Sequence, residues 1–268
     1  MTEIAHAADR QFTADEGHNG PMLADVTCPT GSVHVTVDPA ATVATVRVFT
    51  RDAATSKAAD AVRGTRITQN GVFVTVDVPR VPGGGSGGGT TVSFGGGQTI
   101  INGVSYSGNV TVVNGQIRGG NSVQQVSTGV EVQITLPASS AVRYRGEQGS
   151  LRTVGRLSAV EANGGGSVHV DTAGRLKASV LNGSVTAGRI TEWIDADATN
   201  GSVKVEQYAG EACRIRAANG SVNLTAAPAA SGRLDIEAGN GSIRVYGVQG
   251  RTDLDVHAVA GNGTVRKF

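Results

Sequence analysis

Aromatic and charged residues are both scarce in this sequence of 268 residues, at 4% and 17% of the chain. A thick hydrophobic core normally needs Leu, Phe and Trp, whereas this chain offers mainly Val, Ala, Thr and Gly. The core is therefore expected to be thin and to be crossed by small side chains. The 39 glycines are about twice the average share of roughly 7%, and they indicate many turns.

Several other features are missing, and each absence narrows the class of protein. No apolar run approaches the roughly 18 to 20 residues that span a bilayer. Residues 1–20 have neither the basic region nor the apolar region of a secretory signal, so a cytoplasmic location is expected. The formal net charge of +1 gives no reason to expect a nucleic-acid partner.

Sequence motifs for catalysis and for cofactors are also missing. The sequence has no G-x-S-x-G nucleophile elbow, and the GGGSGGG run from Gly83 is not followed by the Gly-Lys-Ser/Thr of a phosphate-binding loop. Cys28 and Cys213 lie far apart and lack the spacing of metal ligands. His34 and His169 alternate with valines, so they are expected to point outward from strands. We therefore expect no catalytic residue, no metal, no cofactor and no enzymatic activity.

What the second half of the chain does contain is a repeat built around a tetrapeptide close to NGSV. Its intervals of about 18 to 22 residues are typical of solenoids. Apolar residues stand six, four and two positions before the Asn, which is the period-two pattern of a strand with one buried face. A further apolar residue three positions after it starts the next strand. The repeated asparagines are Asn163, Asn182, Asn200, Asn219, Asn240 and Asn262.

Two topologies are compatible with this unit. In a meander of hairpins, Asn-Gly would form a type I′ turn. In a β-solenoid, each repeat is one coil and equivalent residues stack at about 4.8 Å. The columns favour the solenoid, because Ala recurs above Ala, Val above Val and Asn above Asn, and stacked Asn side chains can form a hydrogen-bonded ladder. We predict an all-β fold, a β-solenoid with coils of about 19 residues and structural corners at the six asparagines.

The first part of the chain has the same β character. Period-two valines predict strands over 31–37, 44–50 and 70–79. Residues 52–66 predict one short helix, with Thr55 or Ser56 as its N-cap, which would cover the first coil. The expected organisation is an N-terminal tail over 1–20, a β section with this capping helix over 21–81, a Gly-rich insertion over 82–128, and the NGSV-repeat solenoid over 129–268, continuous with 21–81.

These segments together resemble a bacterial family known as the "putative adhesin" β-repeat proteins, a domain of unknown function. The resemblance covers most of the chain apart from 82–127. It implies a right-handed fold of the single-stranded β-helix type and a non-enzymatic role, and it carries no catalytic residues. The matching stretches are TGSVHVTV, TSKAADAVRG, VFVTVDVPR, VEVQITLP and the coils from Val142 onward.

The outer surface offers one candidate binding feature, a recurring Gly-Arg. If the coils stack, these arginines could form an anion-binding edge, although arginine on strand edges also serves solubility alone. They are Arg156, Arg175, Arg189, Arg233 and Arg251.

Two functions remain open. The first is a structural or interaction protein, a stiff β-solenoid that self-associates through coil ends or edges or presents a surface to another protein. The alternative is a binding module for an anionic polymer, such as a polysaccharide or envelope polymer, through the arginine edge.

Overall fold

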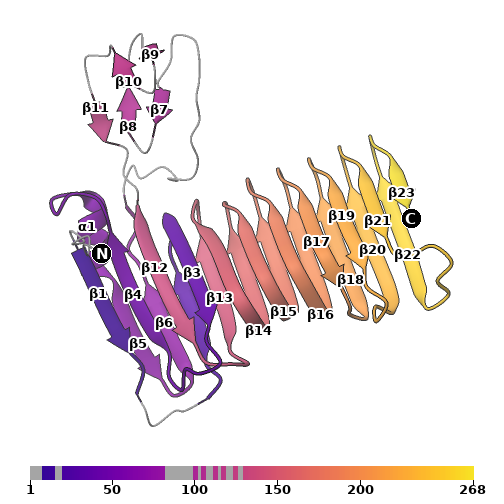
Figure 1. The fold of residues 1–268 in the computed structure, drawn as a ribbon, viewed down its shortest axis with the longest axis horizontal. Helices are drawn as coiled ribbons and strands as arrows, with labels where there is room; N and C mark the ends of the chain where they lie inside the picture. Colours follow the sequence, from indigo (N-terminus) through magenta and orange to yellow (C-terminus); the bar gives the residue numbers. More distant parts are fainter. Residues whose placement is uncertain are drawn as a thin grey trace.

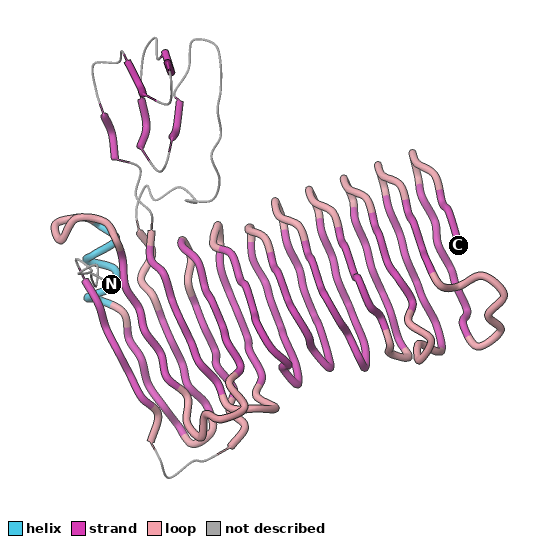
Figure 2. Tube along the Cα trace, in the orientation of Figure 1, coloured by secondary structure: helices cyan, strands magenta, loops and turns pink. Residues whose placement is uncertain are grey.

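The computed structural model describes residues 8–15, 20–81, 99–101, 104–106, 111–113, 116–118, 123–125 and 129–268. Its main body is a β-solenoid in which the strands of successive coils stack along the long axis of the molecule (Figure 1). Each coil contributes one strand segment to each of two facing layers, called layer A and layer B here. The turns that join the layers gather along two edges of the stack (Figure 2).

Layer A holds the segments that lead into the Asn corners. In spatial order it consists of β5 (Arg66–Asn70), β6 (Phe73–Asp77), β2 (Leu23–Thr27), β13 (Ala141–Gly146), the second halves of β14 (Ser150–Gly164), β15 (Val168–Val180) and β16 (Val185–Ala198), and then β18 (Ala212–Ala217), β20 (Gly232–Ala238) and β22 (Leu254–Ala260).

Layer B holds the segments that leave the corners. It consists of β1 (Ala8–Thr13), β4 (Thr45–Thr50), β12 (Val130–Leu136), β3 (Gly31–Val37), the first halves of β14, β15 and β16, and then β17 (Val203–Tyr208), β19 (Val222–Ala226), β21 (Ile243–Tyr246) and β23 (Val265–Lys267). The three long strands bend from one layer to the other, and two of their pairings shift register at the bend.

The pairing of the repeats is parallel, which confirms the solenoid and excludes the meander of hairpins. Residues six positions before successive asparagines are direct partners, as in Leu176↔Ile194 and Ile194↔Cys213. The residues that face inward from the two layers form one continuous core of Val, Ala, Leu and Ile. Tyr144 and Tyr208 are the largest fully buried side chains. The core is therefore thin, as the composition predicts.

An α-helix covers the N-terminal end of the stack. Helix α1 (Lys57–Gly64) begins after Ser56, whose Oγ accepts a hydrogen bond from the Ala59 amide at 3.0 Å. It buries a face of Ala and Val, with Val62 fully enclosed, against β1, β4 and β12. The predicted short helix is thus confirmed, with Ser56 as its N-cap.

Other parts of the N-terminal section differ from the sequence-based expectation. The segment assigned to a tail contains β1, which pairs with β4 in antiparallel orientation. Strands β2 and β5 were not predicted either. Among the described strands of the stack, antiparallel pairs lie at this end, where β1 pairs with β4, β4 with β12, and β5 with β6. Antiparallel neighbours do not repeat one register, so the column pattern that reveals the coils does not reveal β1 and β5, whereas β2 pairs in parallel with β6 and β13.

Within the expected Gly-rich insertion, short strands are described and the remainder lies outside the described residues. Strands β7 (Thr99–Ile101), β8 (Val104–Tyr106) and β11 (Val123–Gln125) form one small antiparallel sheet, and β9 (Thr111–Val113) and β10 (Gln116–Arg118) form another.

Candidate functional site

The Asn corners form a hydrogen-bonded ladder along one edge of the stack. The side-chain amide of each Asn donates to the side-chain oxygen of the Asn one coil earlier, at 2.8–2.9 Å. The members of this ladder are Asn182, Asn200, Asn219, Asn240 and Asn262. Each bond joins identical groups in neighbouring coils, so the ladder holds the coils in one register.

A second ladder runs beside the first. The backbone amides of Ser184, Ser202 and Ser221 each donate to the hydroxyl of the serine one coil earlier, at 3.2–3.3 Å. Between the Asn and the Ser lies a glycine that must stay a glycine, since a Cβ on Gly201 would lie 1.9 Å from the carbonyl oxygen of Gly183. The NGS sequence is therefore a packing requirement of the corner.

The predicted corner at Asn163 is displaced in the structure. Asn163 lies inside β14 and pairs with Ser179. The backbone amide of Asn182 instead donates to the carbonyl of Gly165. The apolar position six residues before the corner is displaced as well, because Val160 and not Leu157 pairs with Leu176. The Gly-Gly-Gly sequence after Asn163 moves this corner along the chain.

The five arginines of the predicted edge are placed on different parts of the surface. Arg156 and Arg189 share one column on the edge opposite the Asn corners, separated by Thr172. Arg175 lies on the outer face of layer A and forms an ion pair with Glu192 at 3.3 Å. A groove of about 470 Å³ adjoins this region, and its lining includes Arg156 and Glu192.

The remaining two arginines are separate from this group. Arg233 lies two coils further along layer A than Trp193, the partner of Arg175. Arg251 lies in a turn. Its guanidinium donates hydrogen bonds to the carbonyls of Ala227 and Ala230 and forms an ion pair with Asp253. The structure therefore does not bring the five arginines into one continuous edge.

One column on the outer face of layer A carries charges in strictly alternating order. Neighbouring side chains interact directly: Arg143 forms an ion pair with Glu161 at 2.9 Å, and His257 forms a hydrogen bond with Asp235 at 3.0 Å. The hydrogen bond from His257 holds the pKa of Asp235 below its usual value. Directly paired positions along this charged column are Asp25, Arg143, Glu161, Lys177, Asp195, Arg214, Asp235 and His257.

The outer face of layer B carries a column of different character. It contains basic and neutral side chains and no acidic one. Directly paired positions along this basic column are His34, Arg152, His169, Thr186, Lys204, Asn223, Arg244 and Arg266. Both predicted outward histidines belong to it and are exposed. Sequence analysis missed both columns. Each keeps a constant spacing in the sequence: the charged column lies five positions before the ladder asparagines, and the basic column lies four positions after them.

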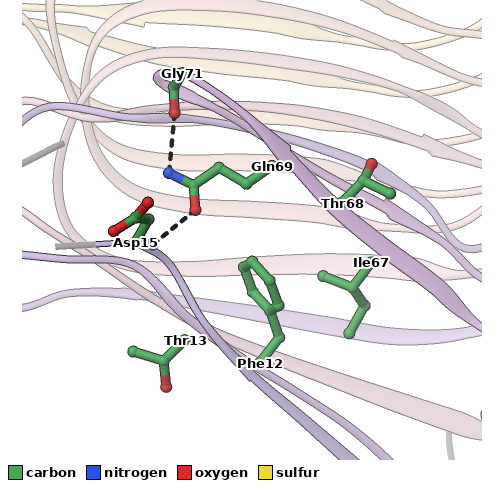
Figure 3. A pocket seen from close by; sticks show the side chains of 7 residues that line it. All are labelled: Phe12, Thr13, Asp15, Ile67, Thr68, Gln69 and Gly71. Carbon is green, nitrogen blue, oxygen red and sulfur yellow. Dashed lines mark hydrogen bonds between the residues drawn. The ribbon is translucent and has the colours of Figure 1, made fainter. Parts of the chain in front are cut away.

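Two further grooves lie on the surface of the described residues. On layer A a groove of about 260 Å³ is lined by Ala141, Ala159, Arg175 and Trp193, the single tryptophan, among others. At the N-terminal end a groove of about 510 Å³ has Phe12 and Ile67 on its walls (Figure 3). There the Gln69 side chain accepts from the Asp15 amide at 2.7 Å and donates to the Gly71 carbonyl at 3.0 Å, which ties β1 to the β5–β6 turn.

The two cysteines are buried core residues. Burial raises the pKa of the Cys28 thiol to about 12, and it raises the pKa of the Cys213 thiol as well. Cys213 pairs with Ile194 and Leu234 in an apolar column. Within the part of the chain that the structure describes, no group of His, Cys, Asp and Glu has metal-ligand geometry.

Both thiols are expected to resist alkylation and disulfide exchange in the folded protein. At pH 8 the thiolate fraction of Cys28 would be on the order of 10⁻⁴, so its reaction should be roughly three orders of magnitude slower than that of a free thiol. Reaction with an aromatic disulfide reagent, followed by absorbance with and without guanidinium, measures this directly. Rapid reaction in the folded state would contradict the burial described here.

Comparisons with known proteins found similar chains among solved structures only. No protein-family model and no curated protein matches the chain. It is similar to the crystal structure of a "putative adhesin" from Bacteroides fragilis, at 13% identity and a TM-score of 0.46 over 97% of both chains. A "putative adhesin" from Parabacteroides merdae is 12% identical, with a TM-score of 0.42 over 97% of this chain and 95% of the other. A "putative lipid binding protein" from Parabacteroides distasonis is 10% identical, with a TM-score of 0.37 over 97% of both.

Two of these three structures are described in the same words as the family that the sequence resembles. The fold class itself rests on the parallel registers described above. Among the described residues, no helix has the length and apolar character needed to cross a membrane.

Proposed function

We propose that this protein is a non-enzymatic interaction protein, a stiff β-solenoid that presents its flat outer faces to a binding partner. The observation that carries the proposal is the pair of ladders at the corner. They fix the register of every coil from Asn182 to Asn262. Outer side chains are consequently held in straight columns at the strand spacing of about 4.8 Å, a geometry suited to recognising another regular surface.

The partner that the outer face of layer A fits best is a second copy of the same chain. A twofold axis parallel to the strands places each column against itself in reverse order. Under that operation Asp25 meets His257, Arg143 meets Asp235, and Lys177 meets Asp195. Because the charges alternate along an even number of positions, every acidic side chain of the column meets a basic one.

The size of this face sets the strength of the expected association. Eight strands about 4.8 Å apart span roughly 34 Å, and segments of about five residues span roughly 17 Å. The face thus offers roughly 600 Å² per copy, below the about 800 Å² per partner of a standard stable interface. The side chains are exposed and charged, and such pairs are weak and screened by salt. We therefore expect dimers at micromolar or higher concentration that dissociate as salt is added.

Reversing one charge at the centre of the face tests the proposal. Lys177→Glu would place two carboxylates together at each of two symmetry-related contacts, and it should weaken dimerisation about tenfold or more. The added substitution Asp195→Lys restores opposite charges between the copies and should recover dimerisation. Light scattering over a concentration series gives the dimerisation constant of each variant.

Negative-stain microscopy of the same samples separates the alternatives. Side-by-side pairs would support contact through layer A. Filaments would place the contact at the coil ends and would contradict this interface. A strict monomer at high concentration would refute self-association, and a charge swap without recovery would refute the twofold arrangement.

A further inference from the structure

The basic column on layer B has no counterpart on layer A. On layer A each basic side chain of the column has acidic neighbours in the adjacent coils. On layer B the neighbours of Arg152 are His34 and His169, and the neighbours of Arg244 are Asn223 and Arg266. Charge on layer A is therefore neutralised within the column, and charge on layer B accumulates along it.

The ion pairs confirm this difference. Across the described ranges, Arg152, Arg244 and Arg266 form no ion pair. Lys204 does form one, with Glu206 at 2.8 Å, and that pairing lowers the pKa of Glu206. Asp171, which lies two residues after His169 on the same strand, accepts a hydrogen bond from the Gly155 amide at 2.9 Å. Several cations of the column are thus exposed and available to an anion.

A row of hydroxyl groups runs parallel to the basic column, two residues earlier on each strand. Four serine hydroxyls each accept a hydrogen bond from a backbone amide of the next coil. They belong to Ser167, Ser184, Ser202 and Ser221. Each of these hydroxyls keeps its own hydrogen to donate. The complete row consists of Ser32, Ser150, Ser167, Ser184, Ser202, Ser221, Ser242 and Thr264.

We infer that the outer face of layer B binds a linear acidic polysaccharide, which lies along the solenoid axis across the coils. The basic column would contact carboxylates through charge-assisted hydrogen bonds, and the serine row would contact sugar hydroxyls. Sugar residues of an extended chain repeat at a length close to the strand spacing of about 4.8 Å, so successive sugars meet successive coils.

The same surface is less suited to a single-stranded nucleic acid. Such strands are bound by aromatic side chains on which the bases stack. Neither the basic column nor the serine row contains Phe, Tyr or Trp, and the nearby Tyr246 and Phe268 stack on each other, with ring centroids 4.8 Å apart. The face is also opposite to layer A, so this binding is independent of the self-association proposed above.

Titration with sodium polygalacturonate fragments of defined length tests the inference, using the full chain carrying Lys177→Glu so that the protein stays monomeric. The basic column spans roughly 34 Å, or about seven strand spacings. Affinity at low salt should therefore rise with fragment length up to about eight sugar residues, one for each position of the column, and then level off. The logarithm of the affinity should fall linearly with the logarithm of the salt concentration as counterions are released.

A triple variant, Arg152→Gln with Lys204→Gln and Arg244→Gln, should bind roughly a hundredfold more weakly, at about fivefold per cation removed. The matched comparison is Arg156→Gln with Arg189→Gln and Arg233→Gln, which removes the same charge from elsewhere and should stay within about threefold of the parent. Arg152→Lys, which keeps the charge, should retain most of the affinity. The altered side chains are exposed, so all variants should melt with the parent.

The other outcomes would overturn the inference. Absence of polygalacturonate binding, or affinity independent of fragment length, would remove layer B as a polymer-binding face. An equal loss in both triple variants would mean a general charge effect, and a larger loss in the second would favour the edge at Arg156. Tighter binding of oligothymidylate than of polygalacturonate would point to nucleic acid. None of these results bears on dimerisation through layer A, which light scattering decides separately.

Discussion

Gly201→Ala is expected to lower the free energy of unfolding by roughly 3 kcal/mol, at the upper end of what overpacking usually costs. The added Cβ would lie 1.9 Å from the carbonyl oxygen of Gly183 and 2.6 Å from its carbonyl carbon. Both are backbone atoms, which cannot rotate away as a side chain could. The Asn and Ser ladders on either side hold the two coils at strand spacing, so relief requires those hydrogen bonds to lengthen.

For a domain of this size, that loss corresponds to a fall in Tm of roughly 6–12 °C, measurable by scanning calorimetry. Gly250→Ala is the control, because a Cβ there meets nothing within 4 Å. Gly250 has a φ of 74°, so alanine would cost about 1–2 kcal/mol in backbone strain alone. If the loss at Gly201 is no larger than the loss at Gly250, close stacking at the corner is not what selects glycine there.

Leu176→Ala is the second substitution with a large expected effect, a loss of about 2–5 kcal/mol. Leu176 is fully buried and stands between Val160 and Ile194 in its column. The core is a thin layer of small side chains between two sheets held in fixed register. Collapse around the cavity is therefore limited, and the value should lie in the upper half of the range.

The same substitution at Leu181 provides the comparison. Leu181 is next to a corner and its exposure is 54%, so Leu181→Ala should change the free energy of unfolding by no more than about 0.5 kcal/mol. Guanidinium unfolding of both variants, monitored by circular dichroism, gives the two values. Similar losses at the two positions would mean that the outer turn contributes as much as the core, contrary to the burial described.

The repeat could be predicted because stacking imposes residue identity at each position. A coil that places Asn200 above Asn182 also places Ile194 above Leu176, and both regularities are visible in the sequence. Asn163 misled the prediction because the glycines that follow it can form a corner as readily as Asn-Gly can. The position of the first corner was therefore decided by packing against the neighbouring coil, which the sequence alone does not specify.

The binding surfaces were harder to predict for a different reason. Gly-Arg pairs drew attention to Arg156 and Arg251, yet those residues stand at varying distances from the asparagines and end in different places. Positions at a constant distance from the corner, such as Lys204 and Arg244, share a column whatever the length of the coil. Stacking in the core requires similar residues at equivalent positions of successive coils, but the outer surface has no such requirement. The charged columns can therefore be recognised only after the outward-facing positions have been aligned across coils.

The coils lengthen toward the C-terminus, with 18, 19, 21 and 22 residues between successive ladder asparagines. The added residues all fall in the turns opposite the Asn ladder, over 209–211, 227–231 and 247–253. From Asn182 to Asn262 the ladder edge keeps corners of one length, whereas the opposite edge is permissive and has accommodated longer turns. Over evolutionary time, new loops can be acquired along that permissive side without disturbing the repeat, and a protein engineer could graft foreign peptides there at intervals of one coil.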